Sequence, residues 1–324
     1  MVTDIEMSAA RRAVDAAAEL CRRTQGALLA GDTLTKGDDS PVTVADFAVQ
    51  AVVAATLTEA LDGFEMVGEE DPADLRGDDQ ASLREAVVGL VRTARGGDVD
   101  AATVLDWIGA GASDGSAPRY WTLDPIDGTK GFLRGDQYAI ALALIEHGEV
   151  VLGVLGCPNL PNPDASTGAV FTAVPGRCEV RTANGVVTAR VAAPATLAEA
   201  RFCESVESGH SNQDHSARIA ARLGIEAPPY RIDSQCKYGA VARGDASIYL
   251  RLPTRADYRE KIWDHAAGSF VVEQAGGRVT DVTGAALDFS RGRRLESNRG
   301  VIATDGRFHD QVLDAVAEVL GSPG

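Results

Sequence analysis

Several features are scarce in this chain of 324 residues. No apolar run approaches the roughly 18 residues of a membrane-spanning helix, so we expect no membrane span. The N-terminus lacks a basic start followed by an apolar stretch, so no secretory signal is expected. The five cysteines are scattered and form no CxxC pair. This spacing argues against a disulfide framework or a zinc site and is typical of a reducing compartment, so we expect a cytoplasmic protein.

Positive charge is also scarce. The chain has 31 Lys and Arg residues against 47 Asp and Glu residues, a formal net charge of −16. A nucleic acid polymer or an anionic membrane surface would be repelled, so neither is an expected partner. If the substrate is nevertheless an anion, bound cations or a few placed Lys and Arg residues must reverse the local field.

The hydrophobic content of 45% and the charged content of 24% are ordinary for a globular protein. Hydrophobic periodicity predicts helices over 4–30, 44–61 and 80–95, and the Gly-, Asp- and Ser-rich residues 96–118 predict a mobile surface loop. A strand should end at "LDPIDG", and a hairpin should turn at His147-Gly148. Beyond the Pro- and Asn-rich segment 158–168, strands alternate with helices, which indicates α/β architecture. We therefore predict two domains, an α+β domain at 1–158 and an α/β domain at 159–324.

The segment "LDPIDGTKGF" is unusual because Asp124 and Asp127 are crowded around Pro125 and followed by a glycine. These residues disfavour a continuous helix, so the segment is predicted to be a bend after a strand. Other acids have simpler explanations. Asp46 has the spacing of a capping box with Thr43, and Asp264 could cap a helix over 264–275. Glu69 could be a solvated acid at a strand end.

A functional interpretation gives each residue of the bend a task. Mg²⁺ prefers carboxylate and carbonyl oxygens, and paired ions can clamp both oxygens of a phosphoryl transfer. Asp124 could bridge two ions, with the Ile126 carbonyl facing one and Asp127 the other. Gly128 and Thr129 would then open a helix whose N-terminus can receive a phosphate.

The blocks "VGEE", "LDPIDGTKGF" and "IWDHAAGSFVVEQAGGRVTDVTG" occur in the order typical of the inositol monophosphatase superfamily, which the chain resembles over nearly its whole length. "SPVTVADFAVQ", "SVESGHS", "DSQCKYGAVARG" and "KIWDHAAG" are similar to the 3'(2'),5'-bisphosphate nucleotidase subfamily. The resemblance implies a layered αβαβα sandwich of the α+β/α/β class, and a lithium-sensitive, Mg²⁺-dependent phosphatase linked to sulfur assimilation.

The resemblance also implies site residues. Two or three Mg²⁺ ions are expected per site: Glu69, Asp124 and the Ile126 carbonyl would hold the ion carrying the attacking water, and Asp124, Asp127 and Asp264 the ion at the leaving oxygen. Asp46 and Thr129 would take the proton of the water. The residues expected to contact a nucleotide are Thr129, His210, Ser234, Lys237, Arg251 and Asp264, with Lys130 possible nearby. A lone Lys or Arg is more often a solvated surface charge. The assignment of Lys237 and Arg251 to substrate binding therefore depends on the matching blocks.

The implied activity is hydrolysis of the 3'-phosphate of adenosine 3',5'-bisphosphate (PAP) to AMP, with the sulfated relative PAPS as a second substrate. An inositol polyphosphate 1-phosphatase or inositol monophosphatase is an alternative from the same class. A non-catalytic nucleotide-binding sensor is an alternative from another class. A P-loop enzyme is disfavoured because no GxxxxGK[ST] segment exists. We expect a monomer whose partner is a small-molecule nucleotide substrate.

Overall fold

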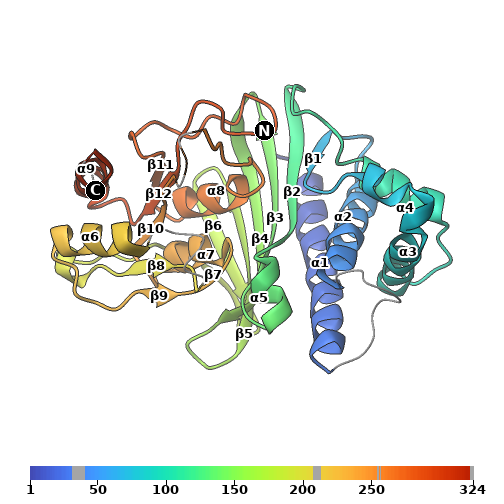
Figure 1. The fold of residues 1–324 in the computed structure, drawn as a ribbon, viewed down its shortest axis with the longest axis horizontal. Coiled ribbons are helices and arrows are strands. Elements are labelled where there is room, and N and C mark those ends of the chain that lie inside the picture. Colours follow the sequence, from blue (N-terminus) through green and yellow to red (C-terminus); the bar gives the residue numbers. More distant parts are fainter. Residues whose placement is uncertain (31–40, 207–212, 254, 256, 322–324) are drawn as a thin grey trace.

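The structure is a computed structural model that describes residues 1–30, 41–206, 213–253, 255 and 257–321. Its helices and sheets alternate in layers (Figure 1). Helices α1 (Asp4–Leu29) and α2 (Pro41–Ala60) pack together and cover one face of the first sheet. A capping box formed by Thr3 and Glu6 begins α1. These elements agree with the predicted helices, although α2 begins three residues earlier than expected.

Helix α2 is long and apolar enough, by length and composition alone, to cross a membrane. The absence of long uninterrupted apolar runs had predicted no such helix. The window Thr43–Ala60 of α2 has a mean hydropathy of 1.2, but 78% of that window is buried inside the fold. A helix that is apolar on all sides and enclosed by other elements is a core helix. No other helix among the described residues passes the same test.

The first sheet has the strand order β1-β2-β3-β4-β5-β6-β7. Only the β1–β2 pairing among these described strands is parallel. At the predicted hairpin turn, His147 and Gly148 have φ values of 52° and 83°, which suit the twist of a two-residue hairpin. The strands are β1 (Met66–Gly68), β2 (Arg119–Asp127), β3 (Ala139–Glu146), β4 (Glu149–Pro161), β5 (Thr167–Val174), β6 (Arg177–Thr182) and β7 (Gly185–Thr188).

The second sheet is mixed and has the order β11-β12-β10-β8-β9. Helices α7 (Cys236–Arg243) and α8 (Ala266–Gln274) contact both sheets, while α6 (Gln213–Leu223) and α9 (His309–Gly321) pack outside the second sheet (Figure 1). This arrangement confirms the layered αβαβα prediction. The strands are β8 (Phe202–Glu204), β9 (Tyr230–Arg231), β10 (Ile248–Arg251), β11 (Arg278–Thr280) and β12 (Val301–Thr304). Short 3₁₀ helices occur at Pro72–Leu75, Asp78–Gln80 and Leu197–Glu199.

The prediction of a mobile loop over 96–118 is wrong. Helix α3 (Ala81–Arg95) ends as expected, but a further helix, α4 (Ala101–Gly109), follows it. Asp100 caps α4 by accepting the Thr103 amide at 2.7 Å, and Val104 and Ile108 are buried. Ala112 then forms a bridge with Val67 of β1. Among the polar residues that suggested a loop, Asp100 is the cap of α4 and Asp106 lies on its exposed face, while most of the others flank the helix.

The division into domains at 1–158 and 159–324 remains a proposal. Its boundary falls within β4, and the first sheet continues to Thr188 before the chain enters the second sheet.

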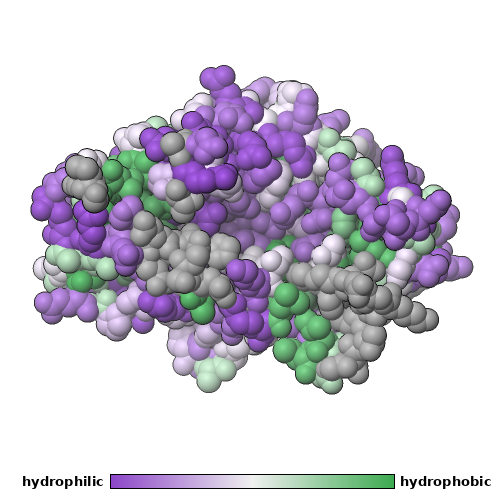
Figure 2. All heavy atoms as spheres, viewed as in Figure 1, coloured by the Kyte–Doolittle hydropathy of each residue, from purple (hydrophilic) through white to green (hydrophobic). Residues whose placement is uncertain are grey.

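The face of the molecule in Figure 2 is mostly hydrophilic. Large exposed apolar side chains among the described residues are scattered: Met1, Ile5, Leu29, Leu133, Val186, Val187 and Val206.

Candidate active site

An irregularity in β2 brings its two aspartates together. Asp124 pairs with Ala141 of β3 and Asp127 pairs with Ala139, so β2 has one residue more than its partner between these points. In a regular strand, residues three apart point to opposite faces. The extra residue of a β-bulge shifts this alternation, and both aspartates line the same cavity. The predicted bend is thus a bulge, and α5 (Thr129–Arg134) begins directly after it.

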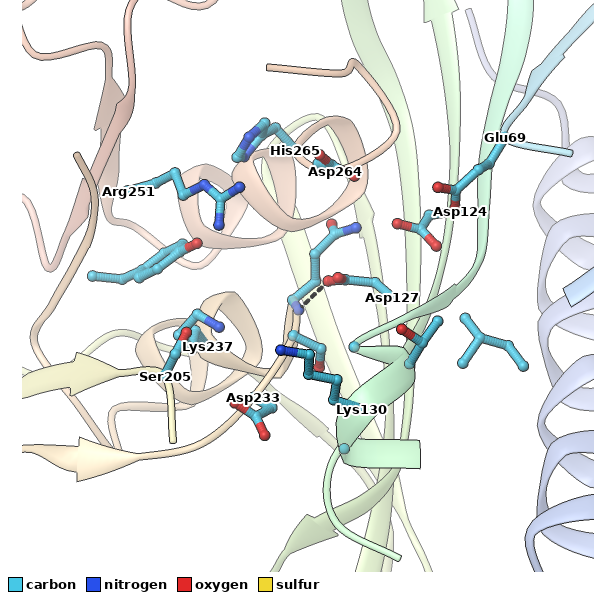
Figure 3. A pocket seen from close by; sticks show the side chains of 17 residues that line it. Glu69, Asp124, Asp127, Lys130, Ser205, Asp233, Lys237, Arg251, Asp264 and His265 are labelled. Atoms are coloured by element: carbon cyan, nitrogen blue, oxygen red, sulfur yellow. Dashed lines mark hydrogen bonds between the residues drawn. The ribbon is translucent and has the colours of Figure 1, made fainter. Parts of the chain in front are cut away.

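The parallel pairing of β1 with β2 supplies a third carboxylate. Gly68 lies opposite Leu123, so Glu69 leaves β1 beside Asp124. Figure 3 shows the two carboxylates close together, and both line the cavity. Residues 55 positions apart in the sequence therefore meet because two strand ends share one edge of the sheet.

The second half of the chain contributes a further carboxylate and two cationic side chains to the cavity. Asp264 lies just before α8, Lys237 lies on α7, and Arg251 ends β10. In Figure 3 the cationic groups of Lys237 and Arg251 lie across the cavity from Glu69 and Asp124. The cavity has a volume of about 280 Å³. It is lined by Glu69, Asp124, Ile126, Asp127, Gly128, Thr129, Lys130, Gly131, Ser205, Asp233, Ser234, Gln235, Lys237, Tyr249, Arg251, Asp264 and His265.

A buried glutamine connects these parts. The backbone amide of Gln235 donates to Oδ2 of Asp127, the contact dashed in Figure 3. Its side-chain amide donates to the Trp263 carbonyl at 2.9 Å, and its side-chain oxygen accepts the Gly268 amide at 3.3 Å. Gln235 thereby fixes Asp127 relative to the segment that carries Asp264.

The simpler explanations of Asp46 and Asp264 are wrong. Helix α2 begins at Pro41, so Asp46 lies inside the helix rather than in a capping box with Thr43. The residue that caps α8 is His265, which makes no side-chain capping bond, so Asp264 is not the N-cap. Pro41 was the available signal, because proline favours the first position of a helix.

Not every predicted site residue lies at the cavity. Asp46 is only 7% exposed and does not line it, and the described residues Asp46 and Thr129 form no hydrogen bond with each other. His210 lies outside the described residues. The other predicted residues, Glu69, Asp124, Ile126, Asp127, Thr129, Ser234, Lys237, Arg251 and Asp264, all line it. Sequence reasoning missed Ser205, Asp233, Gln235, Tyr249 and His265, of which Asp233 and Gln235 flank the predicted Ser234.

The acids repel one another electrostatically. Glu69 keeps an exposed surface at the cavity, but desolvation by the surrounding walls, followed by the charges of Asp264, Glu70 and Asp127, raises its pKa to about 8. Burial and the Glu69 charge also raise the pKa of Asp124 well above its usual range. Burial raises the pKa of Asp264 to about 6. A group of acids that resists ionisation in this way is stabilised by a bound cation.

Buried oxygens identify where a cation fits. Asp124 is 2% exposed, and its Oδ1 has no hydrogen-bond partner among the described residues; the same holds for Oδ1 of Asp46. An unpaired buried carboxylate oxygen is costly unless a ligand satisfies it. Asp124 with its neighbours Glu69 and Asp127 therefore forms an oxygen-rich set suited to a hard divalent cation.

A second acidic group is less suited to a metal. Oxygen and nitrogen atoms of Glu260, Asp264 and His265 lie within 4.8 Å of one another. However, Nδ1 of His265 lies 2.7 Å from the Tyr238 hydroxyl, and Nε2 lies 3.3 Å from Glu260. Because both ring nitrogens already have partners, we interpret Glu260, His265 and Tyr238 as a hydrogen-bond network, whereas Asp264 lines the cavity together with the other acids.

The chain matches the model of the inositol monophosphatase family over residues 1–320. A 3'(2'),5'-bisphosphate nucleotidase of Oryza sativa is 46% identical, with 97% of this chain and 94% of the relative covered. A 3'(2'),5'-bisphosphate nucleotidase 1 of Arabidopsis thaliana is 45% identical, with 99% and 98% covered.

Solved structures share the fold at lower identity. Mycobacterium tuberculosis SuhB aligns with a TM-score of 0.61 and 20% identity, covering 96% of each chain. CysQ from Bacteroides thetaiotaomicron, described as a bacterial member of the inositol monophosphatase family, aligns with a TM-score of 0.60 and 19% identity, covering 92% of this chain and 96% of its own.

Proposed function

Because the chain belongs to the inositol monophosphatase family, we propose that it is a phosphatase that hydrolyses the 3'-phosphate of PAP to AMP and phosphate. PAPS, converted to adenosine phosphosulfate, is proposed as a second substrate. The bisphosphate nucleotidases at 42–46% identity support this substrate class. The inositol phosphatase alternative is not favoured, because relatives at 42–46% identity over most of the chain are named bisphosphate nucleotidases.

The observation that carries the proposal is the division of charge across the cavity. Carboxylates of Glu69 and Asp124 form one wall, and Lys237 and Arg251 lie opposite them (Figure 3). A substrate with two separated phosphates suits this division, since one phosphate can reach the cation-binding acids while the other meets the basic groups. Arg can engage a phosphate through two parallel hydrogen bonds. The N-termini of α7 and α8 also face the cavity and favour negative charge.

The acids fit a Mg²⁺ cofactor, with two or three ions proposed per site. Glu69, Asp124 and the Ile126 carbonyl would hold one ion, and Asp124, Asp127 and Asp264 a second. When bound, the ions would supply charge neutralisation and a lowered pKa of water.

Residues of the chain itself would bind the nucleotide and take a proton from the attacking water. Thr129 at the start of α5 would receive the proton of the attacking water and pass it to Asp46. Burial, then the charges of Glu70 and Glu69, raises the pKa of Asp46. To accept this proton Asp46 must first be ionised, and cations bound by the neighbouring acids would favour its ionised form. The water oxygen would form a bond to phosphorus and the P–O3' bond would break. The 3'-oxygen of AMP would take a proton from bulk water, and Asp46 would release its proton to bulk water. Ser234, Lys237, Arg251 and His210 are proposed to bind the nucleotide.

Phosphate release from a small panel tests the proposal. PAP, PAPS, inositol 1,4-bisphosphate and inositol 1-phosphate are compared with and without Mg²⁺, and with added Li⁺. We expect Mg²⁺-dependent release that is fastest from PAP. No release from PAP with Mg²⁺ would refute the proposed function, and faster release from an inositol phosphate would favour the alternative.

Mg²⁺ should stabilise the protein more at pH 8.5 than at pH 6. The folded protein keeps protons on Glu69 and Asp264 that the unfolded chain releases near pH 4, because their pKa values are raised to about 8 and about 6. Without metal, the free energy of unfolding therefore falls as the pH rises from about 4 to about 8. Bound Mg²⁺ offsets the repulsion between the ionised acids, and it binds only to their ionised form. Its stabilising effect should therefore be larger at pH 8.5, where more of these acids are ionised.

The measurement is the Mg²⁺-induced shift of the melting temperature at both pH values, with EDTA and salt of matched ionic strength as the reference. Equal shifts at pH 6 and pH 8.5 would contradict the role assigned to these acids.

A further inference from the structure

The backbone on either side of Glu69 is held by side chains from distant elements. Before Glu69, the Gly68 carbonyl accepts a hydrogen bond from Nη2 of Arg293 at 2.7 Å. After it, Gln50 of α2 donates to the Glu70 carbonyl at 2.8 Å and accepts the Glu70 amide at 3.1 Å. Gln50 is fully buried. The direction of Glu69 is therefore set by contacts outside β1.

Arg293 lies in the loop between β11 and β12, far along the chain from the first sheet. Its Nη1 donates to the Ser113 carbonyl at 3.1 Å and lies 3.5 Å from the Gly111 carbonyl. The Gly111 carbonyl in turn accepts the Gly68 amide at 2.8 Å. One guanidinium thus reaches both β1 and the segment that follows α4, where the sequence predicted only a mobile loop.

The same side chain contacts the other acid-bearing segment. The guanidinium carbon of Arg293 lies 4.8 Å from the ring centroid of Trp263, and Lys261 lies 5.0 Å from that centroid. Trp263 is 3% exposed and immediately precedes Asp264. Such a cation–π contact within about 6 Å is attractive and fixes the relative position of the two groups.

We propose that Arg293 is a positioning residue that holds Glu69 and Asp264 at the separation required for Mg²⁺ binding. It bonds to the residue before Glu69 and stacks on the residue before Asp264. This inference depends on the metal site of the proposed function.

An arginine is suited to the task because its planar group can donate to several carbonyls and stack on an aromatic ring at the same time. A lysine can keep the charge and one of these contacts, but it cannot reproduce the planar fork. Partners that orient metal ligands typically change metal affinity about 10–100-fold when they are removed.

The test compares Arg293→Gln with Arg294→Gln in the full chain. Arg294 is the neighbouring cation and is similarly half-buried. Its side chain donates to the Arg259 carbonyl at 3.0 Å and makes no hydrogen bond to Gly68 among the described residues. Calorimetric titration of the metal-free proteins with Mg²⁺ alone should show affinity about tenfold weaker or more in Arg293→Gln. Arg294→Gln should stay within about twofold of the wild type, while Arg293→Lys should fall between.

A kinetic readout separates positioning from general damage. At saturating Mg²⁺, the KM of Arg293→Gln for PAP should stay within about threefold of the wild-type value, whereas its Mg²⁺ requirement should rise in parallel with the calorimetric change. Should Arg293→Gln fail to fold, Arg293→Lys supplies the same comparison.

Unchanged Mg²⁺ affinity in the Arg293 variants, with or without a lower melting temperature, would overturn the inference. Failure of the wild type to bind Mg²⁺ or to release phosphate from PAP would instead overturn the proposed function, so the two failures can be told apart.

Discussion

Asp124→Asn is expected to remove phosphate release while making the metal-free protein more stable. Asp124 is 2% exposed, its Oδ1 lacks a partner among the described residues, and burial and the Glu69 charge raise its pKa. Losing several kcal/mol of charge stabilisation in the transition state corresponds to about 10³-fold in turnover. A carboxyl whose pKa is raised in the folded state lowers the free energy of unfolding at neutral pH. Replacing this carboxyl with an amide should therefore raise the free energy of unfolding.

The expected gain in melting temperature without metal is about 2–4 °C. The stabilisation that Mg²⁺ confers on the wild type should largely disappear in this variant. Calorimetry or thermal shift in EDTA and in Mg²⁺, together with phosphate release from PAP, measures both effects.

Asp281→Asn is a matched control. Asp281 is also 2% exposed, but its Oδ1 accepts the Thr283 amide at 2.8 Å, the Thr283 hydroxyl at 2.7 Å and the Ala285 amide at 3.1 Å. Asn keeps one acceptor oxygen, but its amide nitrogen would replace Oδ2, which accepts the Arg299 amide at 3.2 Å. The replacement should therefore destabilise the protein by about 1–3 kcal/mol, because a buried donor loses its acceptor. A destabilised Asp124→Asn protein, or one that keeps its activity, would contradict the role proposed for Asp124.

Lys237→Met is expected to weaken catalysis selectively toward substrates with two phosphates. The Lys237 side chain is 5% exposed on α7, and its Nζ lies 5.3 Å from the ring centroid of Tyr249. Hydrogen bonds to charged groups contribute about 1.5–3 kcal/mol, so kcat/KM for PAP should fall about 10–100-fold. Adenosine 3'-phosphate lacks the second phosphate, so its kcat/KM should change less than about threefold.

Side-by-side kinetics on the two nucleotides measures this selectivity. Arg243→Met serves as the control, because Arg243 is a cation on the same helix that pairs with Asp245 and does not line the cavity. Equal losses on both nucleotides would contradict the assignment of Lys237 to the second phosphate.

Local sequence signals predicted most elements correctly, and their errors have identifiable causes. The turn at His147-Gly148 and the helix after Gly128 depend on nearby residues, and both were predicted. Helix α4 was missed because Gly, Asp and Ser residues flank it, although Asp100 is a capping residue. The capping interpretation of Asp46 was wrong because it ignored Pro41, which begins the helix.

The sequence by itself determined the chemistry of the site. The order of acids and the strand–bend–helix segment from Leu123 to Phe132 follow from residue types and short-range backbone preferences, which act within a few residues. These local features are sufficient to indicate an acidic cation site, and the resemblance of the surrounding blocks to the inositol monophosphatase superfamily implied the phosphatase activity.

Only the tertiary structure decided which side chains meet. The bulge between Asp124 and Asp127 exists only relative to β3, and Glu69 reaches Asp124 only through the parallel register of β1 and β2. The contacts of Arg293 with Gly68 and Trp263 likewise join segments far apart in the chain. Such contacts depend on strand pairing and packing across the whole fold, and no local residue pattern encodes them.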